Sequence, residues 1–115
     1  MITITGRVIS KKNNRRNYGR VSLPSEAFVR FENDALSQLK KCKEKHTGAI
    51  HIDYSFYIKG RMDTDLDNLI TSVNDVLQKA GIIENDRTIL GIEAVKWMGQ
   101  KDFKTEIYIT NLDSE

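Results

Sequence analysis

The chain has 115 residues, of which 39% are hydrophobic and 30% charged, with a formal net charge of +2. This length and composition predict a single domain over residues 1–115 that buries a core without disulfides. No uninterrupted apolar run of about 18 residues occurs, so we expect no membrane span. The start of the chain lacks a signal-peptide pattern. The single cysteine, Cys42, cannot form an internal disulfide, and together these features favour the cytoplasm.

The first 23 residues contain six basic residues and no acidic one. Ile2, Ile4 and Val8 alternate with polar residues, which predicts a half-buried strand. Residues 10–19 have no apolar period, which predicts a loop. Basic residues in this loop would contact phosphates, giving salt-sensitive and sequence-independent affinity for a polyanion. A solvated loop without a ligand explains a basic run taken alone about equally well. The candidate basic contacts are Lys11, Lys12, Arg15, Arg16 and Arg20.

A first helix is predicted to begin at Pro24-Ser25 and to end at His46-Thr47-Gly48. Its apolar residues recur at spacings of three and four, as on one face of a helix. They are Phe28, Phe31, Ala35, Leu39 and Cys42. Strict alternation from Ile50 to Ile58 then gives the strongest strand signal in the chain, and His51 is expected on the polar face of that strand.

A second helix is predicted from Leu66 to Ala80, with Gly81 as the residue that follows its C-cap. A strand is expected over Thr88–Met98, with Trp97 in the core. A turn at residues 99–102 leads to a return strand over Lys104–Thr110. The order is β-α-β-α-β-β, which indicates a small α/β (α+β) fold with two helices and a mixed sheet.

Three aspartates, Asp63, Asp65 and Asp67, precede the second helix. A D-x-D-x-D run also opens an EF-hand loop, but Asn68 stands where that loop needs Gly and Asn74 where it needs Glu. A single N-cap would explain one aspartate and not all three. Asp86 follows the same helix. If the topology returns Asp86 to the first pair, the carboxylates would converge to hold one or two Mg²⁺ ions, which hydrolyse phosphodiesters. His46 and His51 are too few and too separated to predict a histidine-based metal site.

The stretch Asp65-Leu66-Asp67-Asn68, followed nineteen residues after Asp67 by Asp86, resembles the RusA-type Holliday junction resolvases. That family shows D-x-D-N at the start of a helix and a further aspartate in a later turn, here Glu84-Asn85-Asp86-Arg87. The segment Ser10-Lys11-Lys12-Asn13 is similar to the family's loop after its first strand. The order of elements also resembles the family's small mixed fold, so the resemblance covers nearly the whole chain.

The resemblance implies a phage- or prophage-type endonuclease of DNA recombination and repair. Such enzymes are Mg²⁺-dependent homodimers that resolve four-way DNA junctions by paired symmetric nicks in a bacterial or phage-infected cell. It implies no membrane and no small-molecule substrate. Asp65, Asp67 and Asp86 would be the catalytic metal ligands, supported by Asn68 and Asp63. Asn13, Lys59 and Arg61 would join the basic loop in binding DNA.

One position departs from the family pattern, because Thr71 stands where the family has a lysine four residues after the second aspartate. The threonine hydroxyl donates a hydrogen bond but brings no positive charge to the scissile phosphate. Lys59, Arg61 or Arg87 are the candidates for supplying that charge. Two alternatives stay open: a branched-DNA-binding protein that cleaves weakly or not at all, and a metal-binding interaction module without a nucleic-acid role.

Overall fold

The computed structural model describes residues 1–11, 15–18, 21–61 and 64–112, with only the backbone described for residues 15–18, 21, 22 and 24. The elements keep the predicted order, with one extra pair of short strands. They are β1 (Ile2–Thr5), β2 (Arg15–Tyr18), β3 (Val21–Pro24), α1 (Glu26–Leu39), β4 (Ile50–Lys59), α2 (Leu66–Lys79), the short 3-10 helix η1 (Asp86–Thr88), β5 (Ile89–Gln100) and β6 (Lys104–Asn111).

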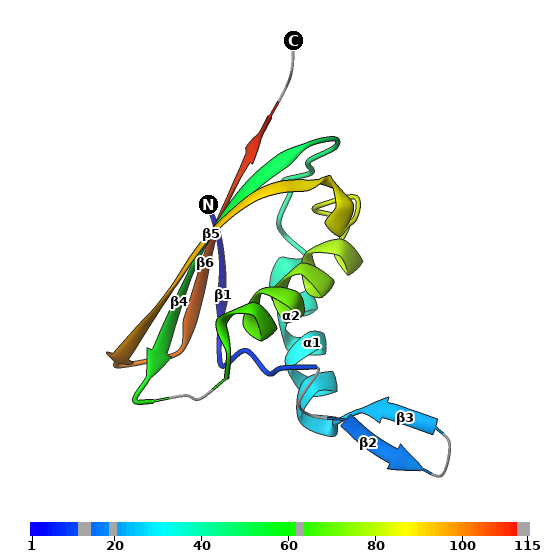
Figure 1. Cartoon of the computed structure of the whole chain (residues 1–115), viewed down its shortest axis with the longest axis vertical. Helices are drawn as coiled ribbons and strands as arrows, with labels where there is room; N and C mark the ends of the chain where they lie inside the picture. The colour runs from blue at the N-terminus through cyan, green and yellow to red at the C-terminus, as the bar shows by residue number, and fades with distance from the viewer. Residues whose placement is uncertain (12–14, 19–20, 62–63, 113–115) are drawn as a thin grey trace.

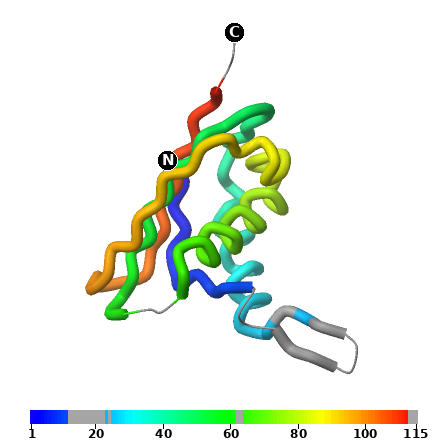
Figure 2. Tube along the Cα trace, viewed as in Figure 1, coloured from blue at the N-terminus to red at the C-terminus, as the bar shows by residue number. Residues whose placement is uncertain are grey.

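Four strands form one mixed sheet in the order β1-β6-β4-β5. Strand β4 is parallel to β5 and antiparallel to β6, and β6 is antiparallel to β1. Both helices lie on the same side of this sheet, and no element of the described residues covers the other face (Figure 1; Figure 2). The predicted small α+β fold with two helices and a mixed sheet is therefore confirmed.

Alternation in β4 decides which face of the sheet packs against the helices. Its buried side chains occupy every second position, while the residues between them are only partly covered. The helix-facing residues are Ile50, Ile52, Tyr54, Phe56 and Ile58, each at most 3% exposed. Helix α2 meets them with Leu69, Val73, Val76 and Leu77, all fully buried. Each such side chain contributes roughly 1.5–3 kcal/mol by leaving water, which fixes the face of α2 that turns to the sheet.

Helix α1 begins where the sequence predicts and ends earlier. Ser25 is the N-cap, and its Oγ accepts a hydrogen bond from the Phe28 backbone N–H at 3.1 Å. The helix ends at Leu39, so Cys42 lies beyond it rather than on its last turn, and Cys42 is half-buried. The prediction that the helix extends to residues 46–48 was wrong.

Two further predictions differ from the structure. Residues 15–18, expected in a loop, form β2, which pairs with β3 in a ribbon that projects from the rest of the molecule (Figure 1). The polar sequence of β2 hides this strand from a search for apolar alternation. Trp97, expected in the core, is 48% exposed. It pairs with Tyr57, which faces away from the helices, so strand register places Trp97 on the open face.

Among the described residues, no helix combines the length and the apolar character that crossing a membrane requires.

Candidate active site

The first two candidate ligands lie at the beginning of α2. The chain leaves β4 through Gly60, whose φ of 67° lies in the left-handed region that glycine adopts without a steric cost. Asp65 is the N-cap of α2, and its backbone carbonyl accepts from the N–H groups of Asn68 and Leu69 at 3.1 and 3.2 Å. Its side chain makes no capping hydrogen bond, which is unusual because an aspartate at this position normally caps. The carboxylate of Asp65 is therefore not used by the helix.

Asp67 follows in the first turn of α2, and both Asp65 and Asp67 are exposed. Within the described part of the chain, neither carboxylate has a hydrogen-bond or ion-pair partner. Hard divalent cations prefer such carboxylate oxygens, so this pair fits Mg²⁺. The negative charges also lie at the positive end of the helix dipole, where such side chains favour helix formation.

The third candidate, Asp86, lies on the same side of the sheet. It begins η1, where Asn85 Oδ1 accepts from the Arg87 backbone N–H at 2.8 Å. Its position is marked by Tyr54 of β4, which donates a hydrogen bond to Asn74 Oδ1 of α2. Burial raises the pKa of Tyr54, the bond to Asn74 opposes this, and the nearby charge of Asp86 raises it further. Asp86 therefore interacts electrostatically with Tyr54.

The three aspartates share one side of the sheet but are not gathered around one point. Asp65 and Asp67 lie at the start of α2, whereas Asp86 follows the other end of this helix, which at 14 residues and 1.5 Å per residue is roughly 20 Å long. Among the described residues, the group of three metal-ligating side chains with ligand atoms within 4.8 Å of one another lies elsewhere, at His51, Asp53 and Glu93. The assignment of Asp65, Asp67 and Asp86 as joint metal ligands stays a prediction.

Two residues of the predicted motif have clear positions in α2. Asn68 is 8% exposed and sits in the first turn, where its backbone N–H bonds to Asp65. Thr71 is exposed, and its Oγ1 donates to the Asp67 carbonyl at 2.9 Å, one turn back along the helix. The hydroxyl is thus occupied by the helix backbone, as is common for threonine within a helix.

Lys96 of β5 lies beside this helix start and was not singled out from the sequence. It pairs with Phe56, so it points to the helix-covered side of the sheet. Its Nζ donates to the carbonyl of Thr64, the residue directly before Asp65, at 2.9 Å. Counting by twos from Ala94, which pairs with buried Tyr54, identifies Lys96 as a charged residue at an inward-facing position. The position of Lys96 can be recognised in this way only when β4 is known to be the neighbour of β5.

The segment that follows β1 is bonded to α2 through Ile9 and Lys11. The buried hydroxyl of Ser72 accepts from the Lys11 backbone N–H at 3.2 Å and donates to the Ile9 carbonyl at 2.9 Å. The Lys11 ammonium lies 3.6 Å from Asp75 Oδ2 and over the ring of Phe28. Lys11 is therefore already engaged with α1 and α2.

The other predicted DNA contacts are described in part. Lys59 and Arg61 are exposed near the end of β4. For Arg15 and Arg16 only the backbone of β2 is described. Lys12, Asn13, Arg20 and Asp63 lie outside the described residues.

The second group of possible metal ligands lies on the open face of the sheet. His51 Nδ1 is 3.8 Å from Asp53 Oδ2, and His51 Nε2 is 3.7 Å from Glu93 Oε1. The ring rests on Gly91, where an added Cβ would come within 2.6 Å of His51 Cδ2. The sequence predicted His51 on a polar strand face, which is confirmed. It missed Glu93, because only the parallel pairing of β4 with β5 places it opposite Asp53.

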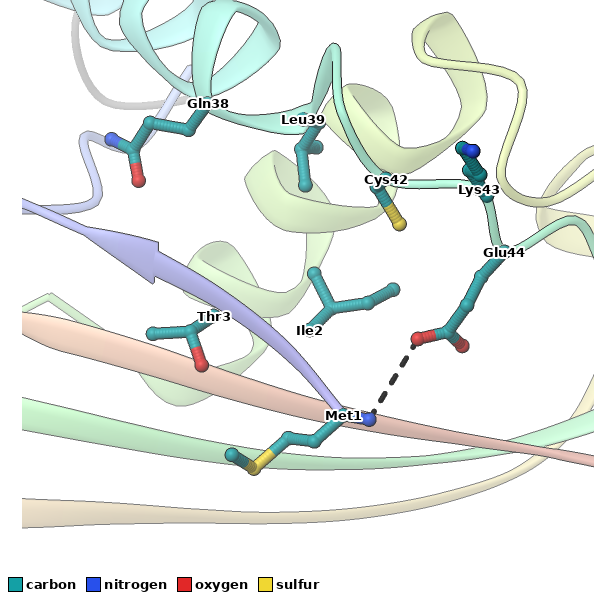
Figure 3. A pocket seen from close by; sticks show the side chains of 8 residues that line it. All are labelled: Met1, Ile2, Thr3, Gln38, Leu39, Cys42, Lys43 and Glu44. Atoms are coloured by element: carbon teal, nitrogen blue, oxygen red, sulfur yellow. Dashed lines mark ion pairs between the residues drawn. The ribbon is translucent and has the colours of Figure 1, made fainter.

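A cavity of about 550 Å³ opens between the start of β1 and the end of α1. Figure 3 shows its lining, including the N-terminal amine of Met1 at 3.7 Å from Glu44 Oε2. None of the candidate site residues lines it. The cavity is therefore separate from the acidic start of α2.

A family model described as endodeoxyribonuclease RusA matches residues 5–110. This chain belongs to the RusA endodeoxyribonuclease family. A curated relative, the crossover junction endodeoxyribonuclease RusA of Aquifex aeolicus, is 38% identical over 47 residues. That stretch is 41% of this chain and spans little more than a third, 37%, of the relative's own length. The acidic start of α2 is the candidate functional site of this family member.

Proposed function

We propose that this protein is a Mg²⁺-dependent endonuclease that resolves four-way DNA junctions by paired symmetric nicks. The observation that carries the proposal is the start of α2, where Asp65 occupies the N-cap but leaves its carboxylate unused beside exposed Asp67. The RusA family match over residues 5–110 supports it, as does the name of the Aquifex relative. Its place of action would be the cytoplasm of a bacterial or phage-infected cell.

Asp65, Asp67 and Asp86 are the residues proposed to hold the metal. Bound Mg²⁺ supplies Lewis acidity that activates water and offsets the charge of the phosphate. The chain offers these carboxylates on two elements, Asp65 and Asp67 at the start of α2 and Asp86 on η1, beyond the far end of that helix. The backbone N–H of Asn68 bonds to the Asp65 carbonyl, which closes the first turn of α2 directly after the first proposed ligand.

DNA binding is proposed for the basic residues of the ribbon and for Lys59 and Arg61. The ribbon projects from the body, which suits it to reach a phosphate backbone away from the cleavage point (Figure 1). Contacts of this kind release counterions, so affinity should fall steeply as salt is added. A metal-binding interaction module without a nucleic-acid role would show no such affinity to lose.

A homodimer is proposed because two opposed strands of a junction require two active sites related by near two-fold symmetry. The open face of the sheet supports self-association. Val95, Trp97 and Tyr108 lie on it and are 44%, 48% and 56% exposed. Large apolar side chains exposed on a face without a described helix are available to bury against a second copy of the chain.

The deciding experiment is cleavage of an end-labelled four-way junction in Mg²⁺, with a linear duplex of the same sequence and the Asp67→Asn variant as controls. We expect paired nicks across the junction for the parent and none in either control. Tight junction binding without nicks would replace the proposal by a branched-DNA-binding function, and Thr71→Lys would then be the next variant. Neither binding nor nicking would leave the interaction module as the remaining alternative.

A further inference from the structure

We infer that Lys96 contacts the scissile phosphate and supplies the positive charge of the active site from strand β5. This inference deepens the proposed function and rests on it. The three cations considered from the sequence, Lys59, Arg61 and Arg87, are all exposed, whereas Lys96 is half-buried beside the acidic start of α2.

The first argument is position. Lys96 projects from the helix-covered side of β5, because it pairs with buried Phe56. Its ammonium is held 2.9 Å from the Thr64 carbonyl, one residue before Asp65. A lysine side chain normally loses considerable rotamer freedom when it binds a ligand. The bond to Thr64 therefore positions the Lys96 ammonium next to the residue that precedes Asp65, the first candidate metal ligand, before any phosphate binds.

The second argument is charge. Several lysines of the described chain have carboxylate partners: Lys11 with Asp75 at 3.6 Å, Lys79 with Glu32 at 2.7 Å, and Lys104 with Glu106 at 3.4 Å. Lys96 has no described carboxylate within 4.0 Å, and its partner at Thr64 is an uncharged carbonyl. The full positive charge is therefore retained. An ammonium has three donors, and the Thr64 bond uses one, which leaves two for phosphate oxygens.

The third argument is burial. A charge beside protein is screened less than one in open solvent, so the same phosphate contact is stronger at Lys96 than at exposed Lys59 or Arg61. A fixed cation near the charge that develops on the phosphate favours the transition state without rearrangement. The occupant that this geometry fits is a phosphodiester lying across the end of β5 against Asp65 and Asp67.

The test compares Lys96→Met with the parent, because methionine keeps an unbranched apolar stem and removes the charge. Lys43→Met, at an exposed lysine after α1, is the matched control. Junction binding is measured by fluorescence anisotropy in EDTA over a range of salt, and cleavage by single-turnover assay in Mg²⁺. We expect Lys96→Met to cleave about a hundred-fold more slowly. We expect its slope of log affinity against log salt to fall by about one, because one contact with a phosphate is lost. The control, Lys43→Met, should keep the slope of the parent.

A chemically altered substrate isolates the contact. After the parent's cleavage position is mapped, a junction with a neutral methylphosphonate at that position is bound in EDTA. The parent should lose affinity on this substrate, and Lys96→Met should bind the altered and unaltered junctions equally. Lys96→Arg, which keeps the charge, should restore most of the salt slope.

Three outcomes would overturn the inference. One is a parent-like salt slope and cleavage rate for Lys96→Met. Another is slower cleavage with an unchanged salt slope and a lowered melting temperature, which would assign Lys96 to holding the Thr64 segment. The third is a loss on the methylphosphonate junction that is as large in Lys96→Met as in the parent. Failure of the parent itself to bind or nick junctions would refute the proposed function instead, so the two failures are distinguishable.

Discussion

Two groups of acidic side chains lie on opposite sides of the same sheet, and they differ in how their charges are used. On the open face, His51 sits between Asp53 and Glu93, with each ring nitrogen within 3.8 Å of a carboxylate oxygen. On the helix side, Asp65 and Asp67 have no described partner. The open-face carboxylates therefore have the His51 imidazole as a close neighbour, whereas the helix-side carboxylates have no described partner. This difference favours the helix-side pair as the proposed active site.

The sharpest test of this comparison is to neutralise each group in turn. We expect Asp67→Asn to lower the single-turnover cleavage rate by at least about a hundred-fold, the scale of losing a preorganised electrostatic group. Glu93→Gln, on the open face, should stay within about twofold of the parent, because exposed ion pairs contribute little. A loss in Glu93→Gln as large as in Asp67→Asn would reverse the comparison.

Metal binding separates the two groups without relying on turnover. Mn²⁺ bound to the protein is measured by electron paramagnetic resonance, with EDTA added to confirm reversal. The parent should bind Mn²⁺, and Asp65→Asn should bind it at least about tenfold more weakly, because hard cations depend on carboxylate oxygens. Asp53→Asn should match the parent. Unchanged binding in Asp65→Asn would move the metal site to the open face.

The helix side also carries the bonds between α2 and the segment that follows β1. Ser72→Ala removes a buried hydroxyl and leaves the Ile9 carbonyl and the Lys11 N–H without their partner. We expect a loss of about 1–3 kcal/mol in the free energy of unfolding, measured in urea. Ser37→Ala, at an exposed position of α1, should change stability by about 0.5 kcal/mol or less. Equal effects would mean that the Ser72 bonds are not maintained in solution.

The smallest effect is expected at Gly91, beneath the His51 ring. Gly91→Ala places a Cβ 2.6 Å from His51 Cδ2, so the ring must rotate away from the strand. The rotation should cost about 1 kcal/mol in the free energy of unfolding, comparable to an off-rotamer side chain. Cleavage should not change. A decrease in the cleavage rate of Gly91→Ala would show that the open face contributes to the reaction.

Local pattern predicted much of this molecule, and long-range pairing explains the rest. The spacing of Leu69, Val73 and Leu77 located α2, and therefore placed Asp65 and Asp67 at a helix start. The alternation in β4 assigned its two faces, including that of His51. No local signal says that β4 and β5 are parallel neighbours in a given register. The exposure of Trp97 and the position of Lys96 both depend on that register, so the sequence missed both.

The β4–β5 register also constrains how the gene can vary. Phe56 lies opposite Lys96, and Tyr57 lies opposite Trp97, because side chains alternate between faces along each strand. A single-codon insertion or deletion between Ala80 and Thr88 that shifted β5 by one residue would exchange the faces of Lys96 and Trp97 together. One event would bring the indole to the helix side and carry the ammonium away from Asp65. A change of length within this connection therefore preserves the site only where the connection absorbs it and the register of β4 with β5 is kept.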